Sequence, residues 1–153
     1  MTAWKRAGRE PRQLINEWLA SLQRVAAERG DHVVMRVNRN WIAFRSENQR
    51  RAFAEIRPTR YRVEVFILPE RRSLSDPAGI ARPSPRTQGW NWFRTKFHVV
   101  GNGHGKAALS LIRQSYTSPS VRTSRSRMRT KGRQSRLETA VSRDGGIVDE
   151  DDK

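Results

Sequence analysis

Four runs of alternating apolar and polar residues restrict this chain to folds built around an antiparallel sheet. The runs are residues 40–46, 51–58, 61–69 and 92–100. A period of two sends successive side chains to opposite faces of a strand, which is typical of a sheet with one buried face. Short gaps between the first three runs indicate hairpins, and therefore antiparallel pairing.

The alternation divides the side chains of these strands into two sets. We expect one face to carry Ile42, Phe44, Ala52, Ala54, Ile56, Tyr61, Val63, Val65, Ile67, Phe93, Thr95, Phe97 and Val99. The other face then carries Trp41, Ala43, Arg45, Phe53, Glu55, Arg57, Arg62, Glu64, Phe66, Trp92, Arg94, Lys96, His98 and Val100. The phenylalanines of the last run are predicted to enter the core, which leaves its cations in solvent.

Two helices flank the four strands. Residues 11–30 repeat apolar side chains at steps of three and four, with Pro11 suited to a first turn and Gly30 to a C-terminal cap. Residues 104–116 place Leu109, Ile112 and Tyr116 on one side. Residues 31–37 are ambiguous between a strand and a helical turn. The expected fold is α+β, with a four-stranded antiparallel sheet covered on one face by an N-terminal and a C-terminal helix.

The boundaries follow from these patterns. Residues 1–11 form an N-terminal extension, residues 12–118 a single domain, and residues 119–153 a disordered tail that is first basic and then acidic. Between Arg122 and Arg136 the tail has seven cations and no acid, a composition that favours disorder. The segment 70–89, rich in proline, serine and glycine, is predicted to be a long loop.

The positive charge lies mainly in the predicted domain. The chain has a formal net charge of +16, and residues 1–118 hold 22 basic and nine acidic residues. Such an excess favours polyanionic partners. The sequence contains no cysteine, which excludes disulfides and thiolate metal sites. No membrane span or secretory signal is apparent, so we expect a cytoplasmic protein without a membrane partner.

Several separated motifs resemble the DUF5655 domain family. They are the strand "FAEIRP", the strand "VEVFILP", an Asp-Pro loop at residues 76–77, "GWNW" at residues 89–92 and the terminal "LIRQSY" at residues 111–116. The similarity covers about residues 38–117, and a more distant one extends to MmcQ/YjbR-like proteins. This sequence departs from the family where "GWNWFRTK" and "GNGHGK" replace acidic or glycine-rich turns with cations.

The resemblance implies a small α+β accessory domain rather than a particular reaction. Members occur beside restriction or nuclease modules, and the YjbR-like fold is associated with DNA binding through its strands. We therefore expect a non-enzymatic domain that binds nucleic acid electrostatically and needs no cofactor. The predicted site is the polar sheet face, with Arg45, Arg57, Arg62, Trp92, Arg94 and Lys96. The sequence leaves Trp92 open between the core and the surface, where it can stack a base, whereas Trp90 is expected to cap the core.

A glycine-rich stretch, residues 101–108, lies between the last strand and the last helix. Gly103, Gly105 and Lys106 form a weak candidate anion site at this helix start. The stretch is one residue too short for a phosphate-binding loop, and Ala107 stands where a metal-binding hydroxyl belongs.

Glu55 and Glu64 can face each other across the hairpin of the second and third runs, as a metal-dependent nuclease would need. Neighbouring arginines make ion pairing the simpler interpretation. His32, His98 and His104 lack ligand spacing, so no metal site is predicted. The alternatives to nucleic-acid binding are docking of an acidic protein and, less favoured, nuclease activity.

Overall fold

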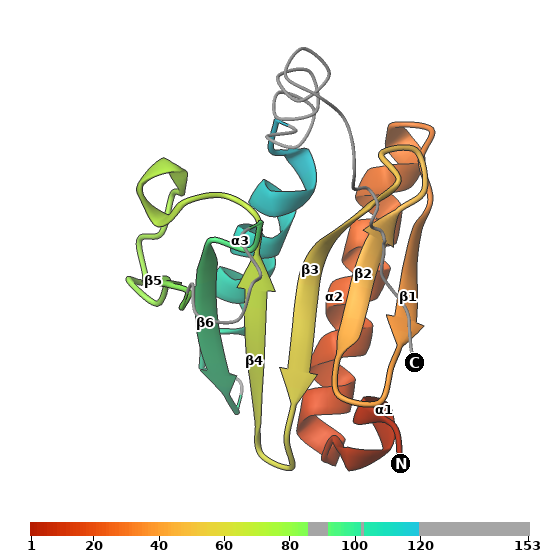
Figure 1. The fold of residues 1–153 in the computed structure, drawn as a ribbon, viewed down its shortest axis with the longest axis vertical. Coiled ribbons are helices and arrows are strands. Elements are labelled where there is room, and N and C mark those ends of the chain that lie inside the picture. Colours follow the sequence, from red (N-terminus) through yellow and green to blue (C-terminus); the bar gives the residue numbers. More distant parts are fainter. Residues whose placement is uncertain (86–91, 102, 120–153) are drawn as a thin grey trace, which may run out of the picture. The chain divides into compact units, whose positions relative to one another are not determined.

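A six-stranded antiparallel sheet forms the centre of the fold in a computed structural model, which describes residues 1–85, 92–101 and 103–119. The strand order is β1-β2-β3-β4-β6-β5 (Figure 1). The strands are β1 (Val33–Val37), β2 (Ile42–Ser46), β3 (Arg51–Pro58), β4 (Arg62–Ile67), β5 (Arg82–Pro83) and β6 (Thr95–Val100). Neighbouring strands are mostly consecutive in sequence, as the short gaps predict.

The predicted number of four strands is wrong, because two further strands extend the sheet at its edges. The ambiguous residues 31–37 contribute β1, which pairs with β2 from Val33↔Ser46 to Val37↔Ile42. The segment expected to be a loop contributes β5, where Arg82 pairs with Lys96. Two-residue strands leave no periodic pattern in a sequence, so composition alone could not reveal β5.

Helices α2 (Arg9–Glu28) and α3 (Gly105–Thr117) lie on the same side of the sheet (Figure 1). A short helix, α1 (Ala3–Arg6), precedes them, and a 3-10 turn, η1 (Arg71–Ser73), follows β4. The α+β class, the antiparallel sheet and the two helices on one face are confirmed. None of the helices in the described part of the chain is long and apolar enough to cross a membrane.

The helix-covered face of the sheet forms the core that the alternation predicts. Ile42, Phe44, Val63, Val65, Ile67, Phe97 and Val99 are at most 1% exposed, and Trp18, Leu22, Leu111 and Ile112 pack on them from the helices. Tyr61 departs from this pattern, because it precedes β4 in the turn after β3 and is 72% exposed.

A β-bulge in β3 reverses the predicted faces of Ala52 and Phe53. Phe44 pairs with Ala54, whereas the next residue, Arg45, pairs with Ala52, so that Phe53 is the inserted residue. One extra residue moves the following side chains to the other face. Phe53 therefore enters the core, with its ring centroid 6.4 Å from that of Phe44 and 5.1 Å from that of Tyr116.

Ser115 attaches α3 to the irregular part of the sheet. Its hydroxyl donates to the carbonyl oxygen of Phe53 at 2.5 Å and accepts from the backbone N–H of Leu68 at 3.0 Å. One buried side chain thus binds backbone groups at the bulge of β3 and just beyond β4.

A buried polar cluster joins the ends of α2, β2 and α3. The Asp31 carboxylate accepts from the Ser46 hydroxyl at 2.6 Å, the Tyr116 hydroxyl at 2.7 Å and the Asn48 backbone N–H at 2.9 Å. Burial alone would raise the pKa of Asp31, but these hydrogen bonds, with one from the His32 backbone, outweigh it and lower that pKa to about 2. Burial and the hydrogen bond to Asp31 raise the pKa of Tyr116 to about 12.

The first residues of the chain pack against the helices and the sheet. Residues 1–11 contain α1 and the start of α2, and Ala3 and Ala7 are nearly fully buried. Gly8 lies so close to the β3–β4 turn that an added Cβ would stand 1.9 Å from the carbonyl oxygen of Arg60. Contacts divide the chain into Met1–Ser118 and Pro119–Lys153. The tail predicted for residues 119–153 lies, apart from Pro119, outside the described residues.

Candidate functional site

The side of the sheet opposite α2 and α3, called the open face below, gathers basic side chains from all six strands or their ends. Pairing across the sheet places Arg36, Ala43, Glu55, Phe66, Lys96 and Arg82 in one row from β1 to β5. The cations of the open face are Arg36, Arg45, Arg57, Arg62, Arg82, Arg94 and Lys96, and the carboxylates on or beside it are Glu55, Glu64 and Glu70.

Glu55 lies at the centre of this face and is only 6% exposed. Its carboxylate accepts from Arg57, with an Nη2–Oε2 distance of 2.9 Å, and the Arg57 guanidinium lies 5.3 Å from the centre of the Phe66 ring. Burial raises the pKa of Glu55 to about 7; Arg57 opposes this shift and the charge of Glu64 adds to it. The negative charge at the centre of the open face is therefore incomplete near neutral pH.

Glu64 contacts two residues of β6. Its carboxylate lies 3.1 Å from His98 Nε2 and 3.7 Å from Lys96 Nζ. The two glutamates are not opposite each other in the hairpin, because Glu55 pairs with Phe66 and Glu64 pairs with Arg57. The expectation that arginines hold these carboxylates is confirmed for Glu55, whereas lysine and histidine hold Glu64. Within the described residues there is no group of three His, Cys, Asp or Glu side chains that could bind a metal ion.

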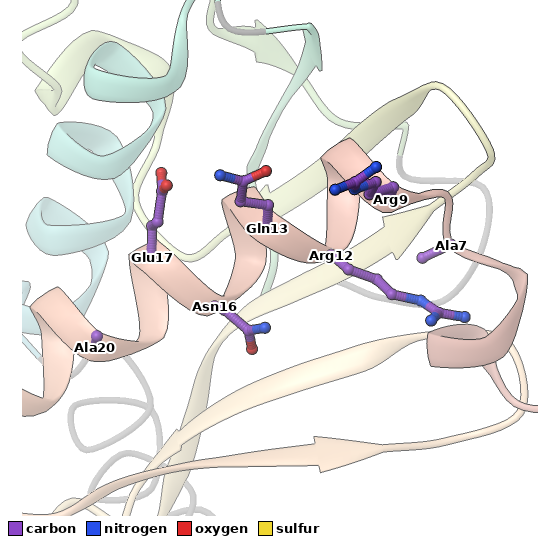
Figure 2. A pocket seen from close by; sticks show the side chains of 7 residues that line it. All are labelled: Ala7, Arg9, Arg12, Gln13, Asn16, Glu17 and Ala20. Atoms are coloured by element: carbon purple, nitrogen blue, oxygen red, sulfur yellow. The ribbon is translucent and has the colours of Figure 1, made fainter.

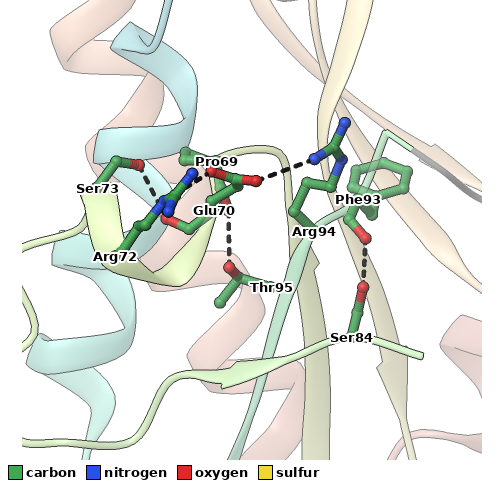
Figure 3. A network of polar contacts seen from close by, with 8 residues as sticks. All are labelled: Pro69, Glu70, Arg72, Ser73, Ser84, Phe93, Arg94 and Thr95. Atoms are coloured by element: carbon green, nitrogen blue, oxygen red, sulfur yellow. Dashed lines mark hydrogen bonds and ion pairs between the residues drawn. The ribbon is translucent and has the colours of Figure 1, made fainter. Parts of the chain in front are cut away.

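The segment that leads into β6 is held by a network beside the β4–η1 junction (Figure 3). Arg94 Nη1 lies 3.2 Å from Glu70 Oε2, Thr95 donates to the Pro69 carbonyl oxygen at 2.7 Å, and Ser84 donates to the Phe93 carbonyl oxygen. The backbone N–H of Arg94 also donates to the Ile67 carbonyl oxygen at 3.0 Å. These contacts position the residue just before them, Trp92, whose side chain is 47% exposed.

The predicted binding residues therefore divide into two groups. Arg57, Arg94 and Lys96 each pair with a different carboxylate. Arg62 is exposed at the start of β4, and Arg45 is half-buried on β2. Trp92 is on the surface, which resolves its ambiguity in the sequence. Trp90 lies outside the described residues. Arg36 and Arg82 were missed because their strands lacked a clear pattern.

One residue of the glycine-rich candidate anion site, Gly105, has a role in packing. The Gly105 carbonyl oxygen accepts from Trp18 Nε1 at 3.1 Å, and a Cβ on Gly105 would stand 3.1 Å from Leu14 Cδ2. Close approach of α2 and α3 thus accounts for this glycine. Gly103 and Lys106 are exposed at the start of α3, and their predicted anion binding stays a prediction.

Two open grooves follow the helices. The larger, about 660 Å³, runs along α2 and is lined by Arg9, Arg12, Glu17, Gln13 and Asn16 with two alanines (Figure 2). Arg12 is committed to α1, because its guanidinium donates to the carbonyl oxygens of Trp4 and Lys5. A smaller groove of about 380 Å³ lies between Val25 on α2 and the outer side of α3.

Comparisons with protein-family models, with curated proteins and with solved structures found no match for this chain. The resemblance to the DUF5655 domain family accordingly remains a prediction from the motifs quoted above.

Proposed function

We propose that this protein is a non-catalytic nucleic-acid-binding domain whose open face contacts the phosphate backbone. The observation that carries the proposal is the excess of cations on that face, where Arg36, Arg45, Arg57, Arg62, Arg82, Arg94 and Lys96 accompany three carboxylates. Helix α2, by contrast, balances three arginines with three glutamates. Phosphates are bound by arginine and lysine with little dependence on sequence.

The ion pairs of the open face are compatible with this role. Glu55 has a pKa of about 7, so part of its charge is already lost at neutral pH. Arg62 is exposed, and the side chains of Arg57 and Arg94 remain about 30% exposed, at 32% and 28%. A phosphate can thus approach these guanidinium groups while they keep their carboxylates, and a polyanion adds the negative charge that the face lacks.

A salt titration of the full chain tests the proposal. Binding to a labelled oligonucleotide should be measurable near 50 mM salt and weaken steeply towards 200 mM. The double substitution Arg36→Gln with Arg62→Gln should reduce the slope of log affinity against log salt by about 1.4 to 1.8, because each lost phosphate contact contributes about 0.7 to 0.9. Failure to bind at about 50 mM salt would refute the proposal.

A matched control separates the open face from the total charge. Arg9→Gln with Arg24→Gln removes the same two charges from exposed positions on α2 and should leave the slope nearly unchanged. Equal effects of the two double variants would mean that net charge, not the open face, governs binding. An acidic protein is the competing partner class, and a pulldown that survives nuclease treatment would favour it.

A further inference from the structure

We propose that the open face takes single-stranded rather than duplex nucleic acid, with Trp92 as a stacking platform for an unpaired base. This inference rests on the proposed function and specifies its substrate class. Three features of the site support it: the shape of the surface that carries the cations, the exposed aromatic side chain at its edge, and the rigid attachment of that side chain.

The shape of the open face does not favour binding in the groove of a duplex. The cations lie on a sheet whose helices α2 and α3 pack on the opposite side (Figure 1). Helices are the elements most often inserted into the major groove of DNA, and neither of these two lies on the basic side. A sheet that carries cations and aromatic rings instead matches the surfaces on which unpaired bases are bound.

Aromatic side chains accompany the cations. Trp92 is 47% exposed two residues before Arg94. Trp41 precedes β2 next to the open face and is partly exposed. Base stacking requires a ring face in solvent and a base released from its partner strand, and a nearby cation then binds the phosphate of the same nucleotide.

The attachment of Trp92 reduces the entropy cost of binding. Phe93 packs in the core at 5% exposure, and Arg94 is held through its backbone to Ile67 and through its side chain to Glu70 (Figure 3). The Trp92 ring itself packs against Phe93, with the centroids 6.5 Å apart. Preorganised aromatic side chains contribute more to affinity, because little freedom is lost on binding.

The experiment measures binding of the full chain to a mixed-sequence strand of about 20 nucleotides, longer than the site of one small domain, and to the same strand annealed to its complement. The single strand should bind more tightly. Trp92→Ala should weaken binding of the single strand about fivefold or more, the effect of losing one stacked base, and should leave duplex binding nearly unchanged.

Two further variants make the result specific. Trp92→Phe keeps an aromatic ring and should retain most of the affinity for the single strand. Val37→Ala shortens an exposed apolar side chain that lies outside the open face and should have no effect. Equal or tighter binding of the duplex, or full single-strand affinity in Trp92→Ala, would overturn this inference and leave the proposed function standing. Absence of binding to both forms would instead refute the proposed function.

Discussion

Glu55 is the residue at which the charge of the open face and the stability of the fold are linked. Its pKa of about 7 lies above the value of 4.5 that applies to an exposed glutamate. The folded chain therefore binds this proton more tightly than the unfolded chain does. The contribution of Glu55 to stability is greatest where both states are protonated, below about pH 4.5, and falls as pH rises from 4.5 to 7.

We expect Glu55→Gln to increase the free energy of unfolding at pH 8, by up to roughly 3 kcal/mol if the whole shift acts on stability. The amide cannot ionise, so the cost of burying a charge disappears, although the ion pair with Arg57 is lost as well. The difference between the variant and the parent chain should shrink as pH falls towards 4.5. Urea unfolding at several pH values measures this dependence.

Glu47→Gln provides the control, because Glu47 is exposed in the turn after β2. It should change stability little and show no comparable pH dependence. A Glu55→Gln variant that is less stable than the parent at pH 8 would contradict the assignment of Glu55 as a carboxylate whose burial is costly.

For individual residues, the sequence predicted on which face of the sheet a side chain lies but not its ion-pair partner. Alternation along β6 correctly assigned Arg94, Lys96 and His98 to one side and Phe97 and Val99 to the other. Partner choice depends on the hairpin register, which placed Glu64 opposite Arg57 and His98. Alternation alone does not distinguish registers that differ by two residues, because both keep every side chain on the same face, so the two glutamates could not be positioned relative to each other.

Among the elements, α3 shows how a single helix stabilises an irregular sheet. Ser115 and Tyr116 are both fully buried, and they contact the bulge in β3 and the Asp31 cluster respectively. The Tyr116 ring also lies against Phe53, the residue that the bulge inserts into the core. The motif "SY" at the end of this helix thus has a structural role in this chain.

Ser115→Ala should destabilise the protein by about 1–3 kcal/mol, because the buried Phe53 carbonyl oxygen and Leu68 N–H lose a shared partner. Ser110→Ala on the exposed side of the same helix should change stability by less than about 0.5 kcal/mol. Thermal or urea unfolding of the two variants measures the difference. Equal stabilities would show that Ser115 does not attach α3 to the sheet.

The long elements were predictable and the irregular ones were not. Helix α2 and strands β3 and β4 have strong periods, and their predicted ranges agree with the structure to within about three residues. The bulge was not predicted because Ala52, Phe53 and Ala54 are all apolar and fit either face of the sheet. Strand β5 is held by pairing with β6 and by its neighbours, a tertiary effect that no local pattern contains.

For the whole molecule, the position of the +16 charge matters more for binding than its size. Cations also lie in turns and on the helices, as at Arg39, Arg71 and Arg113. The open face differs because its cations come from adjacent strands, which are about 4.8 Å apart. Such spacing lets several of them contact one phosphate backbone together, and this cooperation is what the proposed function requires.

Backbone amide chemical shifts of the full chain, followed while a single-stranded oligonucleotide is added at low salt, test this claim most directly. We expect the largest changes at Arg36, Arg45, Arg62, Trp92 and Lys96, and small changes on the outer sides of α2 and α3. Changes concentrated on the helices, with the strands of the open face unaffected, would contradict the account.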